Sequence, residues 1–147
     1  MQGTKLLSRK SLEDFVLLEV TETIPDSFDA YMAGFNAQDA FEFATPFSIS
    51  HPSGDVKKIA SFGGAATPSG YFAQGDSHWL IAEWDHGVTE GGSSGSPIFD
   101  DMKRIRGQLH GGYARCGFEY EDYYGRISES WDSSADATEN LKAHLDP

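Results

Sequence analysis

Short apolar runs, interrupted every few residues by Gly, Pro, Asn, Asp or Ser, are the feature that most constrains the fold of this chain. This spacing suits strands and hairpins better than amphipathic helices, so we predict a mostly β fold. The predicted strands are residues 15–20, 30–35, 47–51, 57–62, 79–84, 97–100, 105–110 and 123–128. A row of short strands of this kind indicates an antiparallel barrel or sandwich.

The segments between these strands carry turn signals, and the end of the chain carries a helix signal. Residues 52–55 and 100–103 are predicted to be hairpin connections, and residues 67–70 a longer loop. Ser133 and Ser134 can cap a segment in which Ala137, Leu141 and Leu145 recur every four residues. We therefore expect one C-terminal helix.

Size and charge narrow the class of protein. The 147 residues suit a single domain, and the net charge of −12 disfavours partners that carry many phosphates or an anionic membrane surface. We therefore expect no nucleic-acid and no membrane partner, and the apolar runs are too short for a membrane span. The first residues lack the pattern of a secretory signal, so the expectation is a cytoplasmic protein or a chain whose front end is absent.

The segment 90–99 carries the strongest chemical signal, because three glycines and three serines precede a strand that begins at Pro97. A glycine two positions before a serine lets the backbone turn so that two amide groups point at one spot. The amides of Gly92 and Ser94 could form an oxyanion hole in this way. The competing interpretation is a flexible Gly/Ser loop with no catalytic role.

Residues 91–95 also match the G-x-S-x-G nucleophile elbow, with Ser93 as the nucleophile. That elbow requires a helix directly after the serine. Residues 97–99 are predicted to be a strand, and the chain is too short and too rich in β structure for that fold. We therefore reject the elbow.

Several motifs in order resemble the chymotrypsin-like serine peptidases, and among them the bacterial lysyl endopeptidases. Residues 89–98 resemble the nucleophile segment, residues 107–112 the strand that pairs with the substrate backbone, and residues 122–127 a wall of the primary specificity pocket. Upstream, residues 14–20 are similar to the segment that carries the triad aspartate. The resemblance implies Ser94 as nucleophile and Asp14 as the carboxylate that orients the base.

The resemblance also implies a fold and a compartment. It implies the second, antiparallel Greek-key six-stranded barrel of a trypsin-like fold with one C-terminal helix, in a secreted bacterial protein. Within a single domain, residues 1–27 would be the inter-barrel segment, residues 28–132 the barrel and residues 133–147 the helix. Relatives use a cysteine at the position of Cys116 to tie this barrel to an N-terminal cysteine, so a free thiol would fit a missing first barrel.

The catalytic base is the element that the sequence does not supply. A serine hydroxyl needs a histidine to take its proton and a carboxylate to hold that histidine, and in this family the histidine precedes the aspartate. All five histidines follow Asp14, namely His51, His78, His86, His110 and His144. We expect His78, His86 and His144 to be solvated and His110 to lie on the substrate-facing strand, so the chain alone should turn over little substrate.

Asp122 is the candidate for specificity, because a carboxylate in a desolvated slot favours a cationic side chain. The resemblance implies cleavage after basic residues, Lys before Arg, with His110, Gly111 and Gly112 beside the substrate. No cofactor is expected, and no spacing indicates a metal site. The alternatives are a non-catalytic binding module that keeps the pocket, and one half of a split protease that pairs with an N-terminal barrel or a second copy of itself.

Overall fold

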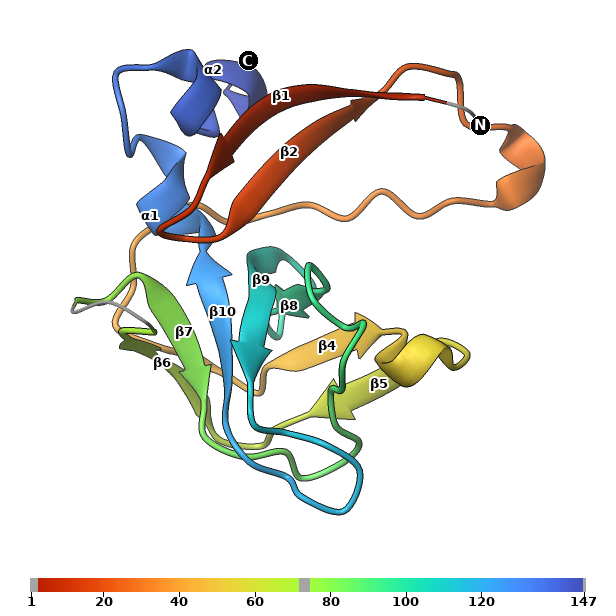
Figure 1. Cartoon of the computed structure of the whole chain (residues 1–147), viewed down its shortest axis with the longest axis vertical. Coiled ribbons are helices and arrows are strands. Elements are labelled where there is room, and N and C mark those ends of the chain that lie inside the picture. The colour runs from red at the N-terminus through yellow and green to blue at the C-terminus, as the bar shows by residue number, and fades with distance from the viewer. Residues whose placement is uncertain (1–2, 72–74, 147) are drawn as a thin grey trace.

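The structure is a computed structural model, and it describes residues 3–71 and 75–146 (Figure 1). The strands are β1 (Thr4–Lys10), β2 (Phe15–Val20), β3 (Phe43–Ala44), β4 (Phe47–Ser50), β5 (Lys58–Ser61), β6 (Ala65–Ser69), β7 (His78–Ile81), β8 (Pro97–Phe99), β9 (Ile105–Gly112) and β10 (Asp122–Arg126). The helical segments are η1 (Asp26–Phe28), η2 (Pro52–Gly54), α1 (Ile127–Trp131), η3 (Ala137–Glu139) and α2 (Lys142–Leu145).

The strands form two antiparallel sheets. β1 and β2 are a two-stranded hairpin, and the other strands form one sheet in the order β3-β6-β7-β10-β9-β8-β4-β5. In Figure 1 the hairpin lies beside the C-terminal helices, above the larger sheet. The predicted mostly-β antiparallel fold is confirmed.

The larger sheet differs in detail from a closed barrel of six strands. Thr45 has a φ of 48° and Pro46 follows it, so one extended segment is divided into β3 and β4. The Thr45 amide donates to the Gly64 carbonyl, and the Phe62 amide donates to the Pro46 carbonyl. These two bonds join the β3–β4 junction to the β5–β6 junction. Within the described residues no strand ladder joins β3 to β5, so the sheet curls without a closing ladder.

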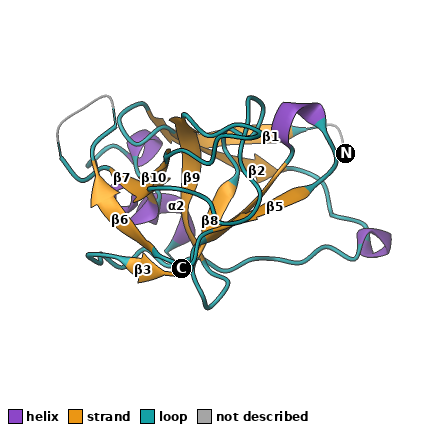
Figure 2. Cartoon of the chain, turned by 90° about the horizontal axis from the view of Figure 1, so that it is seen from below, coloured by secondary structure: helices purple, strands orange, loops and turns teal. Residues whose placement is uncertain are grey.

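Most of the predicted strands are present, and β2 has the predicted bounds. The strand predicted at 30–35 is wrong: residues 21–42 run outside both sheets as a long connection that carries η1 (Figure 2), and only Phe35 makes a single bridge to Ile105. The loop predicted at 67–70 is also wrong, because Ala65–Ser69 forms β6 and pairs with β7. The spacing of apolar residues did not predict β1, whose residues 4–10 pair with β2.

The single C-terminal helix is wrong as well. The segment folds as the short η3 and α2, and the Asp136 side chain accepts the Thr138 amide at the start of η3. The predicted apolar spacing still has a structural role, because Leu141 is buried and Leu145 packs against the same cluster. That cluster joins Phe15 of the hairpin to Ile127 of α1.

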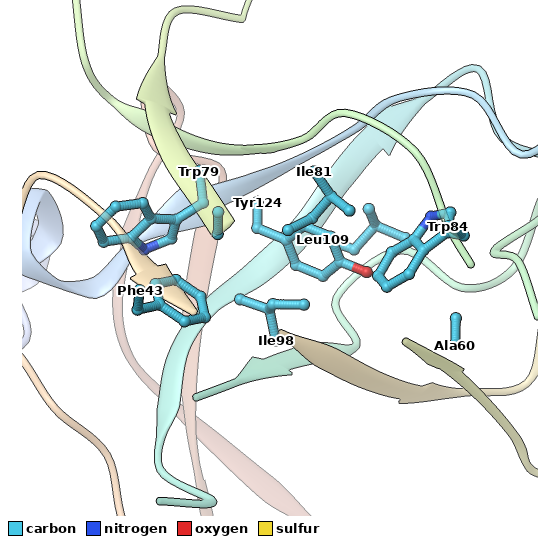
Figure 3. Close-up of a cluster of buried hydrophobic side chains, with 9 residues drawn as sticks. Phe43, Ala60, Trp79, Ile81, Trp84, Ile98, Leu109 and Tyr124 are labelled. Atoms are coloured by element: carbon cyan, nitrogen blue, oxygen red, sulfur yellow. The ribbon is translucent and has the colours of Figure 1, made fainter. Parts of the chain in front are cut away.

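The main core lies between the curled faces of the larger sheet (Figure 3). Trp79 lies at one end of this core: its ring meets Phe43 edge-on at 5.0 Å, and its indole N–H donates to the Arg106 carbonyl at 3.0 Å. Tyr124 and Ile98 are fully buried beside it. The described residues contain no helix long and apolar enough to cross a membrane.

Candidate active site

The loop before β8 holds three of its amides in internal hydrogen bonds. The Ser93 amide donates to the Glu90 carbonyl at 2.9 Å, the Ser96 amide to the Ser93 carbonyl at 3.0 Å, and the Gly95 amide to the Leu109 carbonyl at 2.8 Å. Gly92 and Gly95 have φ values of 93° and 82°, which favour glycine. For the amides of Gly92 and Ser94 no internal acceptor is found in the described part of the chain. These two amides are therefore available to a ligand.

The two serines at the centre of this loop have opposite environments. Ser94 is exposed, whereas Ser93 is buried, where its Oγ accepts the Glu90 amide and donates to Ser50 Oγ, both at 3.3 Å. The loop then continues into strand β8 and not into a helix. A buried serine cannot attack a substrate in solution, so these contacts agree with the rejection of the Ser93 elbow.

Asp14 and Ser94 line one cavity of about 600 Å³. Asp14 lies in the turn between β1 and β2, where its φ is 52°, and its side chain is half exposed. The rest of the wall is mostly apolar, with Phe15, Phe35 and Ile105 among its residues. The fold thus brings to one cavity two polar residues that are 80 positions apart in the sequence.

A close approach between backbones holds the Asp14 turn against the larger sheet. The Gln108 side-chain amide donates to the Glu13 carbonyl at 2.8 Å, and Gly125 leaves room for that carbonyl, because a Cβ there would collide with it. Lys10 pairs with the buried Glu13 carboxylate at 3.3 Å. These contacts fix the backbone directly before Asp14.

His110 lies on β9, as predicted, with its Nε2 3.8 Å from Asp14 Oδ2. Its Nδ1 is 2.9 Å from His78 Nε2, so both ring nitrogens face polar partners. His110 therefore connects the Asp14 carboxylate with His78.

His78 corrects one expectation, because this side chain is fully buried and not solvated. Burial, followed by the charge of His110, lowers the pKa of His78 to about 4. His78 is thus neutral near pH 7, with Ser77 Oγ 2.8 Å from its Nδ1. The strand predicted to begin at Trp79 begins one residue earlier, at His78.

Asp122 is buried at the start of β10, and its carboxylate accepts the Trp84 indole N–H at 2.8 Å and the Thr89 hydroxyl at 2.6 Å. Burial raises the pKa of Asp122, and the hydrogen bonds oppose that rise. Gly112 is opposite it on β9, where a Cβ would collide with the Asp122 carboxylate. At Gly111 a Cβ would lie close to the Tyr71 hydroxyl. The missing Cβ atoms at these two positions thus let the Asp122 carboxylate and the Tyr71 hydroxyl pack close to the β9 backbone.

Glu90 connects the serine loop to two neighbouring segments. One carboxylate oxygen accepts the Cys116 amide at 3.0 Å, and the other accepts the Ser53 hydroxyl at 2.8 Å. These bonds lower the pKa of Glu90. The Cys116 thiol is free and exposed. The Glu90 carboxylate is therefore a bridge that holds the segment around Cys116 against the serine loop.

Comparison with known proteins identifies relatives of this chain. Residues 1–125 match the family Lysyl endopeptidase, C-terminal domain. A lysyl endopeptidase of Pseudomonas aeruginosa is 31% identical over 133 residues, which are 86% of this chain and 28% of that protein. The chain thus spans less than a third of the length of this curated relative.

Solved structures of proteases share the fold. The active form of the Rv3671c protease from M. tuberculosis superposes with a TM-score of 0.61 at 17% identity, covering 94% of this chain and 60% of that chain. The inactive form gives a TM-score of 0.53 at 19% identity, covering 84% of this chain and 60% of that one. The family match and the shared fold confirm the resemblance found in the sequence: this chain belongs to the lysyl endopeptidase C-terminal domain family.

Proposed function

We propose that this chain is the C-terminal part of a serine endopeptidase that cleaves after basic residues, Lys preferred, through an acyl-enzyme on Ser94. The observation that carries the proposal is the shared cavity, because Asp14 and the exposed Ser94 both line it. The family relationship supports the same reaction class. A peptide or protein with a basic residue would be the substrate, and the compartment would be extracellular or periplasmic.

The proposed chemistry assigns the two unused amides of the loop to charge stabilisation. When the Ser94 hydroxyl attacks a peptide carbonyl, negative charge develops on the carbonyl oxygen, and the amides of Gly92 and Ser94 would donate to it. The serine proton must pass to a base, which later donates it to the leaving amine. Collapse of the intermediate leaves the acyl group on Ser94, and water then releases it.

The base would come from outside the described residues. His110, the histidine nearest Asp14, already faces Asp14 and His78 with its two ring nitrogens. The half-exposed Asp14 carboxylate and the apolar cavity wall suit an N-terminal barrel that inserts a histidine between Asp14 and Ser94. Without that histidine the chain should retain only the smaller acceleration due to binding and the oxyanion hole.

The hairpin supports a covering partner. Its exposed apolar side chains are Leu6, Leu12, Val16, Leu18 and Val20. A group of this kind on a soluble protein marks an interaction surface. An N-terminal barrel would cover it, and a second copy of the chain is the alternative occupant.

Specificity would come from Asp122, with His110, Gly111 and Gly112 beside the substrate. An ammonium group that approaches the buried Asp122 carboxylate would compensate the charge that burial disfavours. The two glycines would let the substrate backbone approach β9 closely.

A titration with a fluorophosphonate tests the reaction class. We expect slow labelling that is confined to Ser94 and absent in Ser94→Ala. Rapid, stoichiometric labelling of the chain alone would show that a base is already present, and the account of the triad would then be wrong.

A second candidate is a non-catalytic module that binds lysine-like cations, which the buried Asp122 also favours. Binding of a Lys-ending peptide without any labelling of Ser94 would favour this candidate. Unchanged affinity in Asp122→Ala would eliminate the pocket in both candidates.

A further inference from the structure

A row of polar groups runs from the buried side of β7 to the turn that carries Asp14. Ser77 Oγ is 2.8 Å from His78 Nδ1, His78 Nε2 is 2.9 Å from His110 Nδ1, and His110 Nε2 is 3.8 Å from Asp14 Oδ2. The Asp14 end is half exposed and the His78 end is fully buried. The row therefore connects the interior to the cavity.

The carboxylate at one end of this row assigns a direction to the protons along it. An ionised carboxylate only accepts, so His110 faces Asp14 favourably with a proton on Nε2. A neutral His110 then accepts at Nδ1, which requires His78 to carry its proton on Nε2. His78 consequently accepts at Nδ1, and the Ser77 hydroxyl donates to it. The low pKa of His78 supports this neutral form.

The fold holds both imidazole rings in place. His78 lies on β7 and pairs with Gly125 of β10, while His110 lies on β9 at the other side of β10. The Tyr71 ring meets both imidazoles edge-on, with centroid distances of 5.7 Å to His78 and 5.0 Å to His110. Tyr71 in turn stacks on Tyr123 at 4.3 Å. The rings are thus confined by packing as well as by hydrogen bonds.

We infer that His78 is a positioning residue of the active site, which fixes the tautomer of His110 so that an N–H group faces the inner side of Asp14. The other side of the Asp14 carboxylate then remains directed to the cavity, where the base would bind. This role rests on the function proposed above for Asp14. The row of polar contacts itself does not depend on that function.

Nitrogen-15 NMR of the histidine rings tests the row without any catalysis. In the wild-type chain near pH 7 we expect His78 and His110 both to carry the proton on Nε2. Ser77→Ala removes one hydroxyl and should give His78 a mixture of tautomers. His78→Phe removes the donor to His110 and should give His110 a mixture, whereas His78→Gln keeps a side-chain N–H and should restore the single tautomer.

Two results would overturn the inference: a wild-type His110 that carries its proton on Nδ1, or a His110 tautomer that is the same in His78→Phe as in the wild type. The amide spectrum of each variant shows whether it folds. Should His78→Phe fail to fold, Ser77→Ala decides the matter, because an unchanged His78 tautomer in that variant contradicts the assigned direction.

The rate of Ser94 labelling by a fluorophosphonate, with imidazole added as an external base, separates this inference from the proposed function. We expect a loss of about two- to tenfold in His78→Phe, the effect of losing one ordinary hydrogen bond, and recovery in His78→Gln. If the wild type is labelled and His78→Phe is labelled at the same rate, the positioning role of His78 is refuted while the proposed function stands. If Ser94 is labelled in none of the proteins although the expected tautomers are present, the proposed function is refuted and the row of polar contacts stands.

Discussion

Replacement of Gly125 by alanine tests how the Asp14 turn is held on the larger sheet. A Cβ at this position would collide with the Glu13 carbonyl oxygen and with Gln108 Nε2, which are themselves hydrogen-bonded to each other. Gly125 does not have a positive φ, so the cost arises from the collision and not from backbone strain. The turn must move outward, and Asp14 moves with it.

The magnitude follows from two contributions. Overpacking of a close contact costs about 1–3 kcal/mol, and loss of the bond from Gln108 to the Glu13 carbonyl costs about 0.5–1.5 kcal/mol. We therefore expect Gly125→Ala to lower the free energy of unfolding by roughly 2–4 kcal/mol. Urea unfolding measures this difference, with an unchanged m-value showing that the unfolded state is the same.

Gly34→Ala is the matched control, because a Cβ at Gly34 meets no heavy atom within 4 Å and its φ is not positive. We expect this control to change the free energy of unfolding by no more than about 0.5 kcal/mol. In a Gln108→Ala background the cost of Gly125→Ala should shrink, because one of the two colliding groups is gone. A Gly125→Ala protein as stable as the Gly34→Ala control would refute the reasoning.

Three further predictions concern the surroundings of Ser94. Glu90→Ala should speed hydrogen exchange of the Cys116 amide, whereas the control Glu83→Ala, at an exposed position, should not, and equal exchange in both variants would contradict the bridge. Because its hydrogen bonds lower the pKa of Glu90, the bridge should persist below the ordinary pKa of a glutamate and be lost only at more acidic pH. Asp122→Asn should weaken binding of a Lys-ending peptide at pH 7 by at least about tenfold. Because burial raises the pKa of Asp122, the wild-type affinity measured by calorimetry should begin to fall, as the pH is lowered, at a higher pH than for an ordinary aspartate. A pH-independent affinity would refute this. The exposed Cys116 thiol should react with Ellman's reagent in the folded chain at nearly the rate measured in urea, and strong protection would contradict its exposure.

The spacing of apolar residues predicted strands well where the segment pairs with another strand in the fold. Residues 15–20 and 97–99 lie within predicted strands. Residues 30–35 have strand-like composition, yet Tyr31 and Met32 are exposed, because the segment finds no strand to pair with. Pairing between distant segments, and not local preference, decided this outcome.

Motifs in the sequence suggested candidate site residues, but they did not predict how those residues are arranged. Motif order indicated Ser94, Asp14, His110 and Asp122, and the fold brings the first two to one cavity and the second and third within 3.8 Å. The burial of His78 was missed, because a histidine at a strand end has no local signature that distinguishes the interior from the solvent. Only the pairing of β7 with β10 shows that it faces His110.

The dependence of Ser94 labelling on added imidazole tests the proposed triad most directly. The cavity between Asp14 and Ser94, about 600 Å³, has room for this small ring. We expect imidazole to accelerate labelling by a fluorophosphonate by on the order of 10²-fold in the wild type, and equally in the exposed control Asp29→Asn. Asp14→Asn should lose most of that acceleration. Equal acceleration in all three proteins would contradict the role of Asp14 beside Ser94.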